Sequence, residues 1–320
     1  MALTRTFFVY LLALGTLFFI SACAPKNPLP EVSNTASSKL FVPFVAPRSE
    51  LCASSSIEML ALYWQSKNSF TPALDLHELD ARTLIPAKGG TLQIELSAAA
   101  RADGLVVYPL QGGFEALIAE LSADHPVVAL LNRGFSWYPL WHYAPIVGYE
   151  TQTQQIMTHY ADTPDEMLSL HTFLSMWERA DRWGVILLPP YELPVSLAKE
   201  QVLRSIYDFE STGKREEAIV SYKTAHLRWP YDTNILFALA NAYYKTQRLD
   251  EAEKTYRLIL ALDAKNPLAS NNLADLLTSQ SRLAEALEII EKTSSDDINI
   301  QKILNATRKE ILFLLGLRKQ

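Results

Sequence analysis

Residues 51–64 read Leu-Cys-Ala-Ser-Ser-Ser-Ile-Glu-Met-Leu-Ala-Leu-Tyr-Trp, and this stretch decides how the first half of the chain is organised. Its apolar side chains recur three and four residues apart, which is typical of one face of an amphipathic helix. These side chains are Ile57, Leu60, Ala61 and Trp64. Ser54–Ser56 supply hydroxyl groups of the kind that cap helix starts. The pattern predicts a helix with Cys52 at its N-terminus.

The place of Cys52 on this helix bears on its reactivity. Unpaired backbone N–H groups and the positive end of the helix dipole favour the thiolate, which is the nucleophilic form of cysteine. The alternative is a small buried side chain without a chemical role, because free cysteine is among the most buried residue types. The helix alone leaves both interpretations open.

The N-terminus carries a pattern typical of export and lipid attachment. Met1–Thr6 includes one arginine, and residues 7–20 are almost continuously apolar, which is shorter than a membrane span of ~20 residues. Ile20-Ser21-Ala22-Cys23 then resembles the lipobox of bacterial lipoproteins. The resemblance implies a signal peptide over residues 1–22, a lipid on Cys23, and an outer-membrane protein that faces the periplasm of a Gram-negative bacterium. The alternative is an uncleaved apolar anchor.

Charge and composition bear on which partners, disulfides and cofactors the chain can have. The net charge is −6 and no cluster of lysine and arginine is present, so we expect no nucleic-acid partner. The chain has two cysteines, and a lipid on Cys23 would leave Cys52 without a disulfide partner. No phosphate-binding glycine loop and no metal-ligand spacing is found, so we expect neither a cofactor nor a metal.

The sequence divides into a tether and two domains. Residues 23–39 are rich in proline and serine and predict a tether, residues 40–195 a first domain, and residues 196–320 a second one. In the first domain the patterns predict helices at 51–64, 93–102 and 114–122, followed by strands at 127–131, 142–149, 155–159 and 184–188. This order predicts an α+β fold with a mostly antiparallel sheet.

The first domain resembles the papain-like double-glycine peptidases, which trim bacteriocin leaders. The resemblance rests on the helix that begins with Cys52, a strand that opens with His142, and the turn Asp162-Thr163-Pro164. It implies that Cys52 is the nucleophile, that His142 is the general base and acid, and that Asp162 orients the imidazole. The subgroup with the strongest resemblance joins such a domain to tetratricopeptide repeats in a lipoprotein.

Each of the two partner residues has a simpler interpretation. His142 lies among aromatic residues and fits a buried histidine with satisfied hydrogen bonds. Asp162 precedes Thr-Pro and fits an ordinary turn residue.

Two departures from the family pattern weaken the expectation of turnover. Ala46 and Pro47 occupy the place where active members carry the glutamine that donates to the oxyanion, and Ala53-Ser54-Ser55 replaces Gly-Pro-Ala. Loss of one oxyanion donor typically lowers kcat by ~10²–10³. Ser49 is an alternative donor.

The second domain shows a repeat of 34 residues. Ala218, Ala252 and Ala286 are spaced by this period, and Tyr222 and Tyr256 follow the first two by four residues. Small residues where two helices cross, with larger ones between them, are typical of tetratricopeptide repeats. The pattern predicts repeats at about 199–232, 233–266 and 267–300, followed by a capping helix.

Two functions follow from the sequence. In the first, the chain is a lipid-anchored cysteine peptidase that cleaves or trims a polypeptide docked by the repeats. In the second, a peptidase-like domain without effective turnover acts as a peptide-binding adaptor. The repeats would hold a polypeptide or protein partner in both cases, unless they only brace the first domain or mediate self-association.

Overall fold

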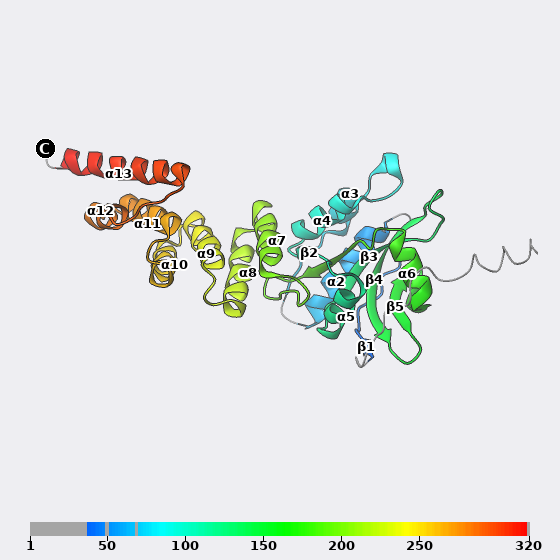
Figure 1. The fold of residues 1–320 in the computed structure, drawn as a ribbon. Coiled ribbons are helices and arrows are strands. Elements are labelled where there is room, and N and C mark those ends of the chain that lie inside the picture. Colours follow the sequence, from blue (N-terminus) through cyan, green and yellow to red (C-terminus); the bar gives the residue numbers. More distant parts are fainter. Residues whose placement is uncertain (1–36, 49–50, 68–69, 319–320) are drawn as a thin grey trace, which may run out of the picture. The chain divides into compact units, whose positions relative to one another are not determined.

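The computed structural model describes residues 37–48, 51–67 and 70–318 (Figure 1). The predicted signal peptide, the predicted lipidation site Cys23 and almost all of the tether lie outside the described residues. The last two tether residues form strand β1 (Ser38–Lys39), so ordered structure begins before residue 40, where we predicted the first domain to start. None of the helices within the described ranges is long and apolar enough to span a membrane.

The sheet is antiparallel throughout its pairings. Its strands follow the order β2-β7-β3-β4-β5-β6, and β1 pairs with β4 beyond the end of β3. The strands are β2 (Val106–Pro109), β3 (Val127–Asn132), β4 (Trp141–Glu150), β5 (Gln155–Tyr160), β6 (Thr163–Ser169) and β7 (Gly184–Leu188). The four predicted strands are confirmed as β3, β4, β5 and β7. Sequence reasoning missed β2, which has only four residues, and β6, which is partly exposed and carries a weak apolar pattern.

Helices alternate with these strands instead of preceding all of them. The predicted helices are confirmed as α2 (Cys52–Lys67), α4 (Gln93–Ala102) and α5 (Gly113–Ser122). Three further helical segments were not predicted: α3 (Leu76–Thr83), the short 3-10 helix η2 (Pro86–Lys88) and α6 (Leu170–Glu178). Strand β2 lies between α4 and α5 in the sequence, and α6 lies between β6 and β7. The antiparallel α+β architecture holds, but the predicted order of helices first is wrong.

Helix α2 is fixed against the sheet by burial and by hydrogen bonds to strand backbones. Ile57 and Leu60 are fully buried, and the Trp64 indole donates to the carbonyl of Leu187 on β7 at 2.8 Å. The three serines are also buried, and Ser56 Oγ donates back to the carbonyl of Cys52 at 2.7 Å. They therefore lie inside the first turns, where short polar side chains bond to preceding carbonyls, and not at a capping position.

Strand β4 passes close to β1, and this contact requires a glycine. A Cβ atom on Gly148 would meet the carbonyl oxygen of Ser38 at 2.3 Å, well inside van der Waals contact. The register of β4 against β5 also shifts between Ile146 and Gly148, as at a β-bulge.

Seven helices form the C-terminal part of the described chain. They are α7 (Lys199–Ser211), α8 (Arg215–Arg228), α9 (Thr233–Lys245), α10 (Leu249–Leu262), α11 (Pro267–Ser279), α12 (Leu283–Glu291) and α13 (Ile298–Arg318). Consecutive helices pack in pairs, and their bounds follow the predicted 34-residue units. Asp232 and Asn266 cap α9 and α11 by accepting hydrogen bonds from backbone N–H groups.

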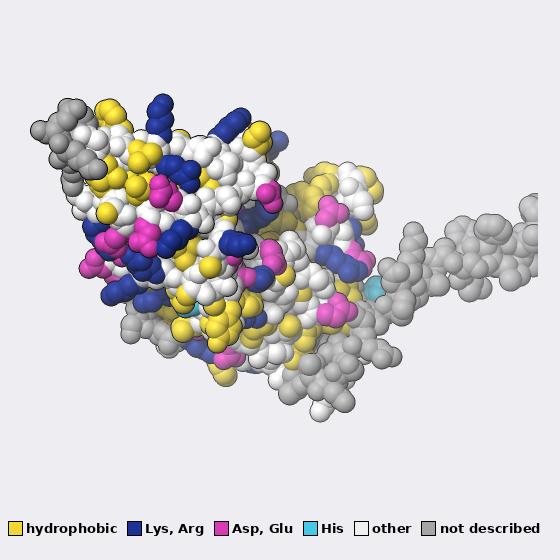
Figure 2. Space-filling view, turned by 60° about the vertical axis from the view of Figure 1, so that its left-hand side comes forward, with side chains coloured by type: hydrophobic (Ala, Val, Ile, Leu, Met, Phe, Trp, Pro, Cys, Tyr) yellow, Lys and Arg dark blue, Asp and Glu magenta, His cyan; other side chains and the backbone are white. Residues whose placement is uncertain are grey.

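The repeat residues predicted from the sequence all lie in the core of this region. Ala218, Tyr222, Ala252, Tyr256 and Ala286 are buried. Alanine at these positions lets two helices approach closely, because a methyl group occupies little space at the crossing. On the face drawn in Figure 2, acidic and basic side chains are interspersed over the repeat helices instead of gathering in one patch of a single sign. Arg282, for example, pairs with both Glu253 and Glu285.

Candidate functional site

The first turn of α2 brings Cys52 beside strand β4 at the residue that follows His142. Ser56, one turn further along α2, lies 3.5 Å from the carbonyl oxygen of Tyr143 through its hydroxyl. The backbone of Tyr143 also lies near enough to the Cys52 thiol to lower its pKa. The structure therefore places the cysteine next to the strand position that the sequence predicted to carry the general base.

The environment of Cys52 favours the neutral thiol. The backbone N–H groups of Tyr143, Cys52 and Ala53 act to lower the pKa of this thiol, as expected at a helix N-terminus. Burial acts in the opposite direction and is the larger effect, so the pKa of Cys52 is raised above its ordinary value. Sequence reasoning correctly placed Cys52 at a helix N-terminus, but it did not predict the burial of the thiol.

His142 is held by a hydrogen bond from the main chain. The residue is 9% exposed, and its Nε2 atom accepts a hydrogen bond from the backbone N–H of Ala161 at 3.0 Å. The ring also packs edge-on against Tyr160, with 5.2 Å between the ring centroids. No hydrogen bond joins the Cys52 sulfur to the imidazole within the described part of the chain.

This contact fixes the protonation state of the imidazole. An acceptor at Nε2 has no proton there, so the neutral ring carries its proton on Nδ1. Protonation of Nε2 would point a second N–H at the N–H of Ala161. Burial is the main cause that lowers the pKa of His142 to about 4, and the positive charge of Arg133 lowers it further. His142 is therefore neutral at pH 7.

Asp162 lies in the turn between β5 and β6, where its side chain is exposed. Its carboxylate accepts a hydrogen bond from Thr163 Oγ1 at 3.3 Å, and no hydrogen bond or ion pair to His142 is present in the described residues. The hydrogen bond to Nε2 of His142 comes from the backbone N–H of Ala161. The orienting role of Asp162 stays a prediction.

Three residues that the sequence analysis did not single out shape the surroundings of His142. Tyr160 contacts the ring, Ala161 donates to it, and the Arg133 guanidinium lies 4.7 Å from the centroid of the Tyr160 ring. Ala161 has φ = 52°, a left-handed conformation that is uncommon without glycine. The sequence Tyr-Ala-Asp at a strand end gives no signal for either contact.

An aromatic hairpin joins β3 to β4 directly before His142. Trp137 is 81% exposed and stacks on Phe135 with 5.5 Å between ring centroids and 6° between ring planes. Tyr138 and Trp141 are also exposed. Five large apolar side chains, including Leu140, are therefore accessible at the end of the sheet where His142 lies.

The described residues offer little to replace the missing oxyanion donor. Ala46 and Pro47 have no side-chain donor, and Ser49 lies outside the described residues. Within residues 37–48, 51–67 and 70–318, no group of three or more His, Cys, Asp or Glu side chains is placed to hold a metal ion.

Comparison with known proteins gives one family match. Residues 211–271, which run from the end of α7 into α11, match the tetratricopeptide repeat family. No curated protein matches the chain.

Solved structures resemble separate parts of the chain. A structure described as a C39-like peptidase from Bacillus anthracis is 15% identical, with a TM-score of 0.40, and the match covers 48% of this chain and 98% of that one. The first tetratricopeptide-repeat domain of Spaghetti (RPAP3), bound to an HSP90 peptide, is 19% identical, with a TM-score of 0.33, over 38% of this chain and 98% of that one. The Yersinia enterocolitica type III secretion chaperone SycD, in complex with a peptide of the translocator YopD, is 19% identical, with a TM-score of 0.34, over 38% of this chain and 94% of that one. Residues 211–271 thus match a repeat family.

Proposed function

We propose that the chain is a polypeptide-binding protein whose first domain, residues 40–195, is a papain-like peptidase domain that holds a peptide without hydrolysing it. The repeats in residues 196–320 would dock the same polypeptide or its parent protein. One observation carries this proposal: the N–H of Ala161 donates to Nε2 of His142.

That hydrogen bond opposes the proton transfer on which a cysteine peptidase depends. The imidazole must take the proton of the thiol and become doubly protonated. With Nε2 accepting from Ala161, the neutral ring already carries its proton on Nδ1 and has no free lone pair to offer Cys52. The thiol, whose pKa is raised by burial, then stays protonated and weakly nucleophilic.

The missing glutamine supports the same conclusion. Without a side-chain donor at residues 46–47, a tetrahedral oxyanion would lose one of its usual hydrogen bonds, at a typical cost of ~10²–10³ in kcat. Binding of an unreacted peptide needs no such donor.

We also propose that the protein is anchored by a lipid on Cys23 in the outer membrane, facing the periplasm. Support comes from the apolar segment at residues 7–20 and the lipobox-like Ile20-Ser21-Ala22-Cys23 that follows it.

The rate of Cys52 alkylation as a function of pH tests the state of the site. The full-length chain with Cys23→Ser, kept in detergent, has Cys52 as its single thiol, and iodoacetamide is the probe. We expect an apparent pKa above the ordinary ~8.5 and a change of less than about twofold in rate with His142→Gln.

A cysteine peptidase with turnover is the second candidate. The contact of Cys52 with the N–H of Tyr143, next to His142, favours it, because this contact stabilises a thiolate. An apparent pKa well below ~8.5 that rises in the His142→Gln protein would establish an activated pair and replace the binding proposal.

A further inference from the structure

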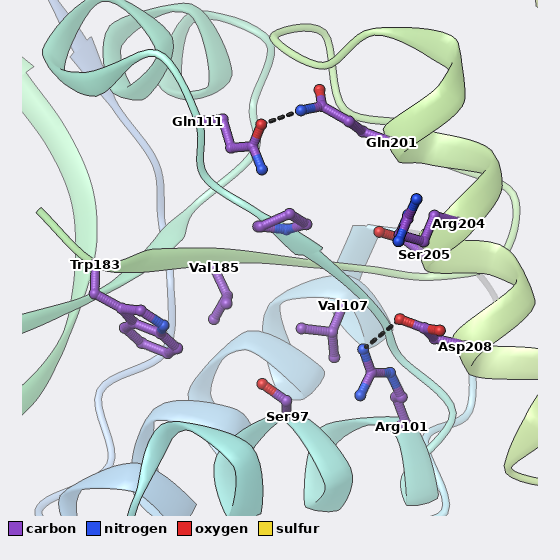
Figure 3. Close-up of a pocket in the computed structure, with 11 residues that line it drawn as sticks. Ser97, Arg101, Val107, Gln111, Trp183, Val185, Gln201, Arg204, Ser205 and Asp208 are labelled. Atoms are coloured by element: carbon purple, nitrogen blue, oxygen red, sulfur yellow. Dashed lines mark hydrogen bonds and ion pairs between the residues drawn. The ribbon is translucent and has the colours of Figure 1, made fainter.

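A cavity of about 530 Å³ lies between the sheet and the first repeat helix. Its walls come from α4, from β2 and β7, and from α7, as Figure 3 shows. A hydrogen bond between the side chains of Gln201 and Gln111 joins α7 to the segment after β2 at the rim. The volume falls within the range of roughly 300–1,000 Å³ that is usual for ligand sites.

The cavity has an apolar floor. Val107 and Pro109 are two residues apart on β2 and therefore share one face of the sheet. Val185 on β7 pairs with Pro109 and lies on the same face. Trp183 covers one end of the cavity in Figure 3. These side chains would accept an apolar group.

The opposite end of the cavity is positively charged. Arg101 of α4 and Arg204 of α7 contribute two cations, and Asp208 contributes one carboxylate (Figure 3). Arg101 Nη2 lies 3.7 Å from Asp208, too far for a strong hydrogen bond, and Arg101 Nε is buried without a partner. Arg204 forms no ion pair or hydrogen bond with the residues that the structure describes.

The unpaired N–H groups of Arg101 and Arg204 favour a ligand whose anionic group has more than one oxygen. A guanidinium presents N–H groups in a planar fork that matches a carboxylate. Burial of Arg101 lowers its pKa, which shows that Asp208 compensates only in part for the lost hydration of the guanidinium. The cavity thus combines an incompletely paired cationic end with an apolar end.

We propose that this cavity binds the C-terminal residue of a polypeptide, with its carboxylate on Arg101 and Arg204 and its apolar side chain between Trp183 and Val185. The inference rests on the proposed function, because it names the part of the bound polypeptide that the first domain recognises. Trp183 also packs edge-on against Tyr143, with 5.6 Å between ring centroids, and the backbone of Tyr143 acts on the pKa of Cys52.

Calorimetric titration of the full-length chain in detergent tests this assignment. The probes are acetyl-Ala-Ala-Phe with a free carboxylate and the same peptide with an amidated C-terminus. We expect the acid to bind with a Kd below ~1 mM and the amide to bind at least about tenfold more weakly, because the amide lacks the charge for two guanidinium groups.

Three variants locate the binding. Arg204→Gln should weaken binding of the acid about tenfold, whereas Arg215→Gln, which removes the same charge from an exposed site at the start of α8, should leave it unchanged. Asp208→Asn should tighten binding several-fold, because it removes the carboxylate that competes for Arg101. A purely structural role for these residues would not produce a gain in affinity.

The outcomes separate this inference from the proposed function. Equal binding of acid and amide, or equal effects of the two arginine variants, would overturn the cavity as a carboxylate site while leaving the polypeptide-binding proposal in place. Absence of binding by both peptides would also overturn the cavity assignment. An activated Cys52 in the alkylation assay would refute the non-hydrolysing proposal without changing the expected titrations.

Discussion

His142→Gln is expected to abolish a loss of stability that the wild-type chain shows as the pH falls from 6.5 to 4. Glutamine is the matched replacement, because its side-chain oxygen can accept from Ala161 N–H roughly where Nε2 does, and it does not titrate. The variant keeps the hydrogen bond and removes only the proton equilibrium.

The sign follows from the two states of the imidazole. In the folded chain burial lowers the pKa of His142 to about 4, while the unfolded side chain has its ordinary value of 6.5. Below pH 6.5 the unfolded state therefore binds more protons, and the free energy of unfolding falls until the folded ring also titrates near pH 4. The difference between these two pKa values corresponds to about 3.4 kcal/mol in total and to about 2 kcal/mol at pH 5. His142 is 9% exposed, so solvent screening changes this free energy little.

Urea unfolding followed by tryptophan fluorescence measures the effect. Five of the six tryptophans lie in the first domain, so the signal reports mainly on the region around His142: Trp64, Trp137, Trp141, Trp177 and Trp183. The change in unfolding free energy between pH 8 and pH 5 should be larger in wild type than in His142→Gln by about 2 kcal/mol. All other titrating groups contribute equally in the two proteins, so their contributions cancel in this difference.

Equal pH dependence in the two proteins would refute the reasoning. A pKa at or above 6.5 for the His142 imidazole, measured by NMR from the chemical shift of its Cε1 proton, would also refute it. Such a value requires a partner that stabilises the imidazolium. A Cys52 thiolate would be such a partner, and the peptidase proposal would then be favoured.

Other expectations concern stability at four positions. Ala161→Gly should stabilise the chain by up to about 1 kcal/mol in urea unfolding, since φ = 52° is strained for alanine and free for glycine; a loss of stability would contradict this. Asp103→Asn should remove a loss of stability of about 2 kcal/mol that develops as the pH rises from 4 to 6, because burial raises the pKa of Asp103 to about 6 and the folded state therefore favours its neutral form; an unchanged pH profile would argue against it. Glu120→Ala should cost about 3 kcal/mol, because the buried carboxylate accepts from Ser196 N at 2.7 Å and lies 2.6 Å from His125, and a melting temperature within a degree or two of wild type would show that water replaces these contacts. Ala252→Leu should cost about 1–3 kcal/mol by overpacking the buried helix crossing, and the test is whether circular dichroism shows earlier melting of the repeats.

The sequence alone determined the elements that follow from periodicity. The helix at Cys52, four of the strands and the repeat helices follow from apolar spacing, because side chains on one face of a helix or strand must recur at its period to be buried together. The 34-residue spacing of Ala218, Ala252 and Ala286 likewise predicted the helix crossings, since only small side chains fit there.

Only the tertiary structure decided the state of the candidate site. Its decisive contact comes from a backbone N–H, that of Ala161, and every residue except proline carries such a group, so the sequence holds no signal for it. The raised pKa of Cys52 and the lowered pKa of His142 also depend on burial, which arises from segments remote in sequence. The cavity between α4, the sheet and α7 has the same origin, because Arg101 and Arg204 are 103 positions apart in the sequence and meet only when the first repeat helix packs on β2.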